Sequence, residues 1–199
     1  MTGSRVAIII LAAGASSRMS IPKQLLPMRG RNLLRHTIDE ALTSKAGNVY
    51  VVLGADATQI QNKLGKADFS IVMNPHWQEG MSSSIRAGLS VLPESVDAAI
   101  ITLCDQPFLS TQVLDALIEA FTSSGKTIVA SAFEGAVGPP VLFSRKHFPE
   151  LMQLQGDTGA RSVVLKHEAD AARVPFPSGS VDLDTPEDYQ QFIKKDLGM

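Results

Sequence analysis

The sequence predicts an α/β fold in which a mostly parallel sheet is covered by helices on both faces. Short apolar segments rich in Val and Ile alternate along the chain with segments whose apolar residues recur at helical spacing. The first apolar segment, residues 6–11, carries no charge, which is typical of a strand buried on both faces. Such an alternation favours a layered fold, because each helix crosses over to bring the next strand alongside the last.

The other elements follow from local signals. Further strands are expected at residues 48–53, 69–73, 97–103, 126–133 and 137–143. Helices are expected at residues 32–44, 56–64, 82–92, 110–123 and 157–166. Asp56 is a candidate helix cap and Pro93 stops the third helix. A last short extended piece ends at Asp184, and Thr185 caps a terminal helix with Pro186 at its first position.

Size and composition exclude several classes of protein. The chain has 199 residues, 44% of them hydrophobic, which suffice for one sizeable core and are few for two, so a single domain over residues 1–199 is expected. A net charge of -2 gives no basic face for nucleic acid. Cys104 is the one cysteine, as is usual in a reducing compartment. Residues 1–5 lead straight into the first strand, and no apolar run approaches a membrane span, so we expect a cytoplasmic protein without a signal peptide.

The first strand runs into a loop of small residues that ends in two cations. Residues 12–17 place no bulky side chain over the backbone, and Arg18 and Lys23 follow. Exposed backbone N–H groups and two cations suit a polyphosphate, although a small-residue turn with two solvated cations has the same composition. The loop lacks the GxxxxGK[ST] spacing, and no GxGxxG occurs in the chain.

Acidic side chains follow other strands of the predicted sheet, where ligands of α/β folds bind. Asp105 follows the strand at 97–103 and suits Mg²⁺, or it caps a turn. Asp182 and Asp184 are two residues apart in an extended piece and face the same side, so the pattern does not separate them as metal ligands. Gly80 gives a sharp turn before Ser84 and the serines that precede it. These serines either contact a ligand at this edge of the sheet or only cap a helix.

Several motifs between residues 6 and 190 together resemble one family. LAAGASSRMSIPKQLLPMRGRNLL (11–34) is similar to the signature of the molybdenum cofactor cytidylyltransferases and their MobA-like relatives. The other motifs are NPHWQEGMSSSIRAGL (74–89), CDQP (104–107) with VDLDTPED (181–188), GPPVLF (138–143) and GDTGAR (156–161). Two positions depart from the pattern: Ser20 replaces a usual glycine, and Pro139 replaces an expected histidine, which removes a polar side chain.

The resemblance implies a three-layer, Rossmann-like nucleotidyltransferase that uses Mg²⁺ to move CMP from CTP onto molybdopterin phosphate, releasing pyrophosphate. Lys23 and Arg18 would hold the triphosphate, and Asp105 and Asp184 the metal, with Lys23, Arg18 and Asp105 as the catalytic set. The nucleotide site would add Leu11, Ala12, Ala13, Gly14, Gly80 and Ser84. The acceptor site would use Trp77, Asp157 and Arg161, although Asp157 is equally a helix cap. In this family LAAG goes with cytidine enzymes and LAGG with guanosine enzymes, so the resemblance favours CTP. A physical reason for the pattern is that the methyl group of Ala13 would narrow the base pocket, and a purine needs more room.

This chemistry needs no general base, because an acceptor phosphate is already deprotonated. We therefore interpret His36, His76, His147 and His167, which show no metal-ligand spacing, as structural or surface residues. The absence of GxSxG disfavours a serine hydrolase. Two alternatives remain: a CTP enzyme acting on a sugar or polyol phosphate, and a non-enzymatic maturation protein that carries the cofactor to a molybdenum enzyme.

Overall fold

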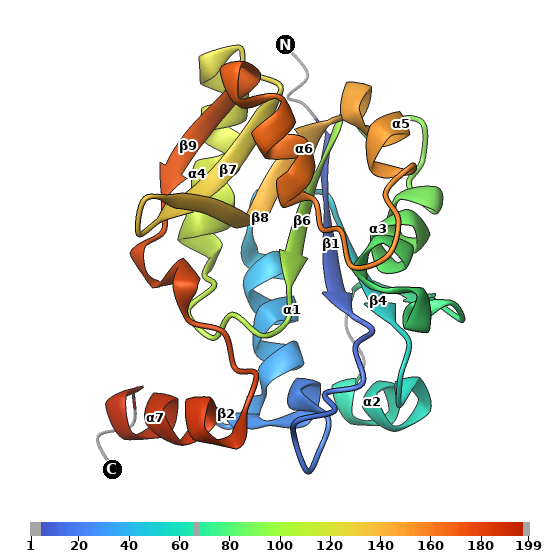
Figure 1. The fold of residues 1–199 in the computed structure, drawn as a ribbon, viewed down its shortest axis with the longest axis vertical. Helices are drawn as coiled ribbons and strands as arrows, with labels where there is room; N and C mark the ends of the chain where they lie inside the picture. The colour runs from blue at the N-terminus through green and yellow to red at the C-terminus, as the bar shows by residue number, and fades with distance from the viewer. Residues whose placement is uncertain (1–4, 66–67, 197–199) are drawn as a thin grey trace.

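A computed structural model describes residues 5–65 and 68–196 of the chain. In this part of the chain a seven-stranded sheet has the order β5-β4-β1-β6-β8-β7-β9 (Figure 1). Its strands are β1 (Val6–Ala12), β4 (Asn48–Leu53), β5 (Ser70–Met73), β6 (Ala98–Leu103), β7 (Ile128–Phe133), β8 (Ala136–Ser144) and β9 (Ala171–Pro175). A small hairpin of β2 (Pro27–Met28) and β3 (Arg31–Asn32) lies apart from this sheet. The predicted mostly parallel α/β fold is confirmed.

One strand of the large sheet runs against its neighbours. β8 pairs antiparallel with both β6 and β7, whereas the other strand pairs of this sheet in the described residues are parallel. The reversal follows from the link between β7 and β8, which consists only of Glu134 and Gly135, both at positive φ. Two left-handed residues make a tight hairpin, so β8 folds straight back along β7.

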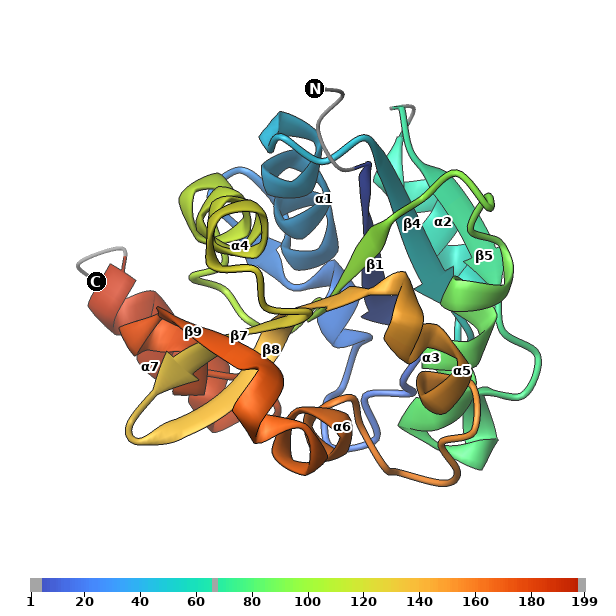
Figure 2. The same cartoon turned by 90° about the horizontal axis from the view of Figure 1, so that it is seen from above.

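Helices cover both faces of the sheet (Figure 2). They are α1 (Leu33–Thr43), α2 (Ala57–Leu64), α3 (Met81–Ser90), α4 (Thr111–Ser124), α5 (Phe148–Leu151), α6 (Arg161–Lys166) and α7 (Pro186–Asp196). Alternate residues of β1 point to two separate cores: Ile8 and Ile10 pack with α1, α2 and α4, and Ile9 packs with α3, α5 and α6. Gly88 lets α3 approach β1, because a Cβ there would lie 2.5 Å from Ile9 Cγ2. The result is the expected three-layer arrangement.

Most expected elements are present within a residue or two of their predicted ends, and three expectations need correction. The helix expected at 157–166 begins only at Arg161, because Gly156 O accepts a hydrogen bond from Ser82 N, which holds the turn at residues 155–158 against the start of α3. Asp56 precedes α2 in a left-handed conformation, and its side chain makes no capping hydrogen bond. Residues 181–184 form no strand, whereas the edge strand β9, with Val174 as its buried apolar residue, was not predicted.

The sheet topology sets the place of the candidate site. β1 and β6 are parallel neighbours with Leu11 opposite Leu103, so the loop after β1 and Asp105 after β6 leave the sheet side by side. Cys104 is buried in the core, and burial raises the pKa of its thiol to about 12, which does not suit a nucleophile. None of the helices in the described residues is long and apolar enough to cross a membrane.

Candidate active site

The loop after β1 is held by a buried side chain that the sequence analysis did not single out. Gln24 is fully buried, and its Nε2 donates to the carbonyl oxygens of Ala12 at 2.9 Å and Gly14 at 3.0 Å. Ser16 Oγ donates to Gln24 Oε1 at 3.3 Å and accepts from Lys23 N at 3.0 Å. Gln24 thus folds the loop back on itself. Its sequence signal is a lone amide in an apolar stretch directly after Lys23.

Lys23 lies between two of the predicted carboxylates. Its Nζ is 2.5 Å from Asp105 Oδ2 and 2.9 Å from Asp184 Oδ1, and Arg18 Nη2 is 3.0 Å from Asp184 Oδ2. The side chains of Lys23 and Asp105 are only 16% and 12% exposed, whereas Arg18 is 64% exposed. Burial acts to lower the pKa of Lys23, but the two carboxylates outweigh it and raise that pKa above its ordinary value.

The C-terminal acidic segment reaches Asp105 through a backbone contact. Leu183 N donates to Asp105 O at 3.0 Å, and the buried Leu183 side chain packs with Leu26 and Phe192. This anchor places the two flanking aspartates at the site. Burial acts to raise the pKa of Asp184, but its bonds to Lys23 and Arg18 bring that pKa below the usual value.

Asp182 is the least compensated carboxylate of the cluster. Partial desolvation, followed by the negative charges of Asp105 and Asp184, raises the pKa of Asp182 to about 6, although the side chain keeps contact with solvent.

The donor set fits a hard divalent cation. Asp105 Oδ1 is buried and has no hydrogen-bond partner among the described residues, so it is an available acceptor beside the carboxylates of Asp182 and Asp184. Clustered carboxylate oxygens are the ligands that Mg²⁺ prefers, and a divalent charge would offset the repulsion among these carboxylates. Lys23 supplies one positive charge at this place.

A pocket of about 410 Å³ opens beside the cluster. It brings together most residues predicted for the site: Leu11, Ala12, Ala13, Gly14, Lys23, Trp77, Gly80, Ser84, Asp105 and Asp157. A smaller hollow of about 140 Å³ is lined by Gly14, Ser16, Ser17, Arg18, Lys23 and Asp184. Arg161 lines neither hollow: it is exposed at the first position of α6, and its role stays a prediction.

The motif at residues 74–89 is partly structural. Asn74 is buried, and its Nδ2 donates to Ser83 Oγ at 2.8 Å and to Ser84 Oγ at 3.0 Å, which fixes the start of α3. Gly80 is required by packing, because it has φ +100° and a Cβ there would lie 2.4 Å from the carbonyl carbon of Gly156. The glycine therefore lets the turn at 155–157 close against α3 and brings Asp157 to the pocket.

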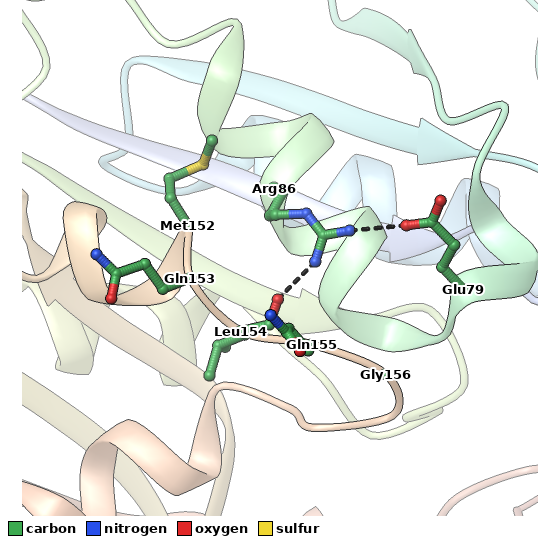
Figure 3. A pocket seen from close by; sticks show the side chains of 7 residues that line it. All are labelled: Glu79, Arg86, Met152, Gln153, Leu154, Gln155 and Gly156. Atoms are coloured by element: carbon green, nitrogen blue, oxygen red, sulfur yellow. Dashed lines mark hydrogen bonds and ion pairs between the residues drawn. The ribbon is translucent and has the colours of Figure 1, made fainter.

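A larger hollow of about 620 Å³ lies on the other side of this contact (Figure 3). Its lining includes Arg86, whose guanidinium donates to Leu154 O at 2.5 Å and pairs with Glu79 at 3.0 Å. The hollow has no carboxylate cluster and no contact with the loop after β1. The pocket of about 410 Å³, which has both features, is therefore the candidate nucleotide site, although its volume is lower.

A small-residue loop with two cations follows β1, and Asp105 follows the neighbouring parallel strand β6, an arrangement that suits a nucleotide-binding transferase. The comparison with protein families agrees: the chain belongs to the family of MobA-like NTP transferase domains, whose family model matches residues 8–171. The nucleotidyltransferase class expected from the sequence is thereby confirmed, and the family comprises enzymes that transfer nucleotides.

Curated relatives carry different names. Purine catabolism protein PucB of Bacillus subtilis is 32% identical over 91% of this chain and 92% of its own length. Nicotine blue oxidoreductase of Paenarthrobacter nicotinovorans is 30% identical, covering 93% and 95%. The molybdenum cofactor cytidylyltransferase of Escherichia coli is 24% identical, covering 94% of both chains. Two relatives are thus more similar than the cytidylyltransferase, so the family is shown and the particular member is not.

Solved structures of related proteins share the fold. The Mycobacterium tuberculosis Rv0371c homologue from Mycobacterium sp. strain JC1 superposes with a TM-score of 0.86 at 27% identity, covering 98% of both chains. Rv0371c from M. tuberculosis H37Rv, solved as a complex with manganese, has a TM-score of 0.82 at 26% identity, covering 96% of this chain and 99% of its own.

Proposed function

We propose that this protein transfers CMP from CTP to the phosphate of molybdopterin and releases pyrophosphate, with Mg²⁺ as its metal. The observation that carries the proposal is the position of Lys23, which contacts Asp105 and Asp184 while it lines the pocket beside the loop after β1. Cations and metal-binding carboxylates meet there around a space that suits a triphosphate. The E. coli relative, a molybdenum cofactor cytidylyltransferase, and the motif at 156–161 support the molybdopterin acceptor.

In the proposed mechanism this chain positions and neutralises charge. The ammonium of Lys23 moves from the carboxylates to the triphosphate, and the exposed Arg18 guanidinium binds its outer oxygens. Asp105 and Asp184 would hold Mg²⁺, with Asp182 beside them. When bound, the metal supplies Lewis-acid charge neutralisation at the phosphates. The Lys23 ammonium would then stabilise the charge that develops on the leaving pyrophosphate.

The base would be selected by the wall that β1 forms. Ala13 is 4% exposed, and its carbonyl oxygen accepts from Ala55 N at 3.0 Å, so its position is fixed. A fixed methyl group at this wall takes space that a purine needs. Leu11, Ala12 and Gly14 complete the wall, and Gln24 holds it through two carbonyls. We propose a preference for CTP on this basis.

Trp77 and Asp157 line the other side of the pocket, where we place the acceptor. An indole ring suits a flat heterocycle such as a pterin. A sugar or polyol phosphate would use the same cations and carboxylates, so the acceptor is the point that experiment must decide. A maturation protein without turnover would bind the cofactor in the same pocket.

One assay separates these functions. The protein is incubated with Mg²⁺, each nucleoside triphosphate in turn, and molybdopterin or a panel of sugar and polyol phosphates, and pyrophosphate release is measured. We expect release only with CTP and molybdopterin. Release with a sugar or polyol phosphate alone would move the acceptor assignment, and no release with any pair would contradict the enzyme. Binding of molybdopterin without release would indicate the maturation protein. In the same assay Lys23→Ala should release less pyrophosphate than the wild type. Lys63→Ala, which removes an exposed lysine of α2, is its matched control.

A further inference from the structure

Three potential metal ligands meet far from the nucleotide pocket. His147 ends a 3-10 turn before α5, Glu150 lies in α5, and His167 follows α6. One ligand atom from each lies within 4.8 Å of the others. The cluster is next to Thr127, which precedes β7, and close to the end of β8, which pairs with the first residue of β6. It therefore lies at the edge of the sheet opposite Asp105.

Hydrogen bonding fixes the tautomer of His147. Thr127 Oγ1 has a single hydrogen and lies 2.5 Å from Asp170 Oδ2, a carboxylate that only accepts. The Thr127 hydroxyl therefore donates to Asp170. His147 Nε2 lies 2.9 Å from Thr127 Oγ1 and must be the donor to that oxygen. A neutral His147 then carries its lone pair on Nδ1. Lys146 Nζ holds Asp170 from the other side at 2.6 Å. A ring nitrogen bonded to an oriented acceptor is the arrangement that positions metal-binding histidines.

The other two groups complete a mixed nitrogen and oxygen set. His167 Nε2 lies 2.7 Å from Glu150 Oε2, and the ring centroids of His147 and His167 are 5.0 Å apart. The other oxygen of Glu150, Oε1, pairs with Lys166 Nζ at 2.6 Å, so Oε2 is the oxygen that faces His167. His147 is 4% exposed, whereas the side chains of Glu150 and His167 are 29% and 33% exposed. The cluster is thus anchored at its buried end and open to solvent at the other.

We propose that His147, Glu150 and His167 form a second metal site, selective for a borderline divalent ion such as Zn²⁺ over Mg²⁺. Two imidazoles and one carboxylate are a ligand set of zinc, and imidazole nitrogen disfavours Mg²⁺. A metal here would join α5 to the end of α6 and so hold both ends of residues 152–160. That segment carries Asp157 to the proposed nucleotide pocket. The site is independent of the proposed function.

Zinc binding to the full chain, freed of metal with a chelator, tests the proposal by isothermal titration calorimetry. We expect Zn²⁺ binding that excess Mg²⁺ does not displace, with an affinity at least about tenfold weaker in His167→Ala and in Glu150→Gln, since loss of even an outer partner of a ligand costs 10–100-fold. His76→Ala, which removes an exposed histidine near Glu79, is the matched control and should bind as the wild type does. Asp184→Asn should also leave this binding unchanged, because the aspartate cluster lies at the other edge of the sheet.

Two results would overturn the site. One is the absence of zinc binding by the wild-type chain; the other is equal affinity in His167→Ala, His76→Ala and the wild type, with circular dichroism showing each folded. X-ray absorption of the zinc complex gives an independent readout, with two imidazole ligands expected and an oxygen-only shell contradicting the proposal. Because Glu150→Gln keeps the shape of the side chain, its affinity separates loss of a ligand from loss of fold.

Discussion

Replacing Lys23 with Ala tests the charge balance of the site. The substitution leaves Asp105 12% exposed with no cation, beside Asp184, whose side chain is 39% exposed. Removal of one partner of a buried ion pair typically costs 3–5 kcal/mol, because an uncompensated charge stays behind. The pair with Asp184 adds little, because solvent screens it. We therefore expect Lys23→Ala to lower the free energy of unfolding by about 3 kcal/mol at pH 7, measured by urea denaturation.

The same substitution should reduce turnover more than it reduces folding. Loss of one preorganised charge donor costs about 2–4 kcal/mol of transition-state stabilisation, which is roughly 30- to 1,000-fold in kcat/KM for pyrophosphate release. Mg²⁺ should stabilise Lys23→Ala against urea more than it stabilises the wild type, because the lysine no longer competes for Asp105 and Asp184.

Two controls make this prediction refutable. Lys63→Ala should change neither stability nor turnover, because its side chain is exposed on α2. In a double-mutant cycle, adding Asp105→Asn to Lys23→Ala should recover about 1 kcal/mol or more of the lost stability. The reasoning fails if Lys23→Ala unfolds like the wild type, if the cycle shows no coupling, or if turnover falls only in proportion to the folded fraction.

Three further predictions concern neighbouring residues. Gln24→Ala leaves two loop carbonyls without their donor, so it should lower the free energy of unfolding by about 2 kcal/mol and raise the KM for CTP. Gln61→Ala, which removes an exposed glutamine, should change neither quantity. An unchanged KM in Gln24→Ala would exclude a role of Gln24 in holding the loop. Ala13→Gly should lower the ratio of kcat/KM for CTP over GTP, and an unchanged ratio would contradict the proposed base wall. The pKa of Asp182 is raised from 3.8 to about 6 on folding, so the folded state favours its protonated form and stability from this group falls as the pH rises from about 4 to 6. Asp182→Asn should remove that decline in the free energy of unfolding, measured by urea denaturation between pH 4 and pH 8. A pH profile identical to that of the wild type would show that folding does not raise the pKa of Asp182.

Much of the fold was predictable because its signals are local. The strand at 48–53 has the predicted bounds, since its apolar run is flanked by Gly47 and Gly54. The terminal helix begins at Pro186 as expected, with Thr185 Oγ1 accepting from Asp188 N at 3.2 Å. The order of the motifs also places the loop after β1 and Asp105 at one edge, because parallel strands end on the same side. Edge strand β9 carried too little signal, because only Val174 among its five residues is buried.

By itself, then, the sequence determined the layered α/β class, most element positions and the family, because hydrophobic periodicity, caps and contiguous motifs are properties of neighbouring residues. The tertiary structure alone decided which charges meet. Lys23 contacts Asp105 and Asp184 across 82 and 161 residues of chain, and no periodicity encodes such a separation. The same holds for the late start of α6, which yields to packing of Gly156 against α3, and for the tautomer of His147, which depends on Thr127 and Asp170. These features arise from the folding of distant segments onto one another, so they become visible only when the whole chain is assembled.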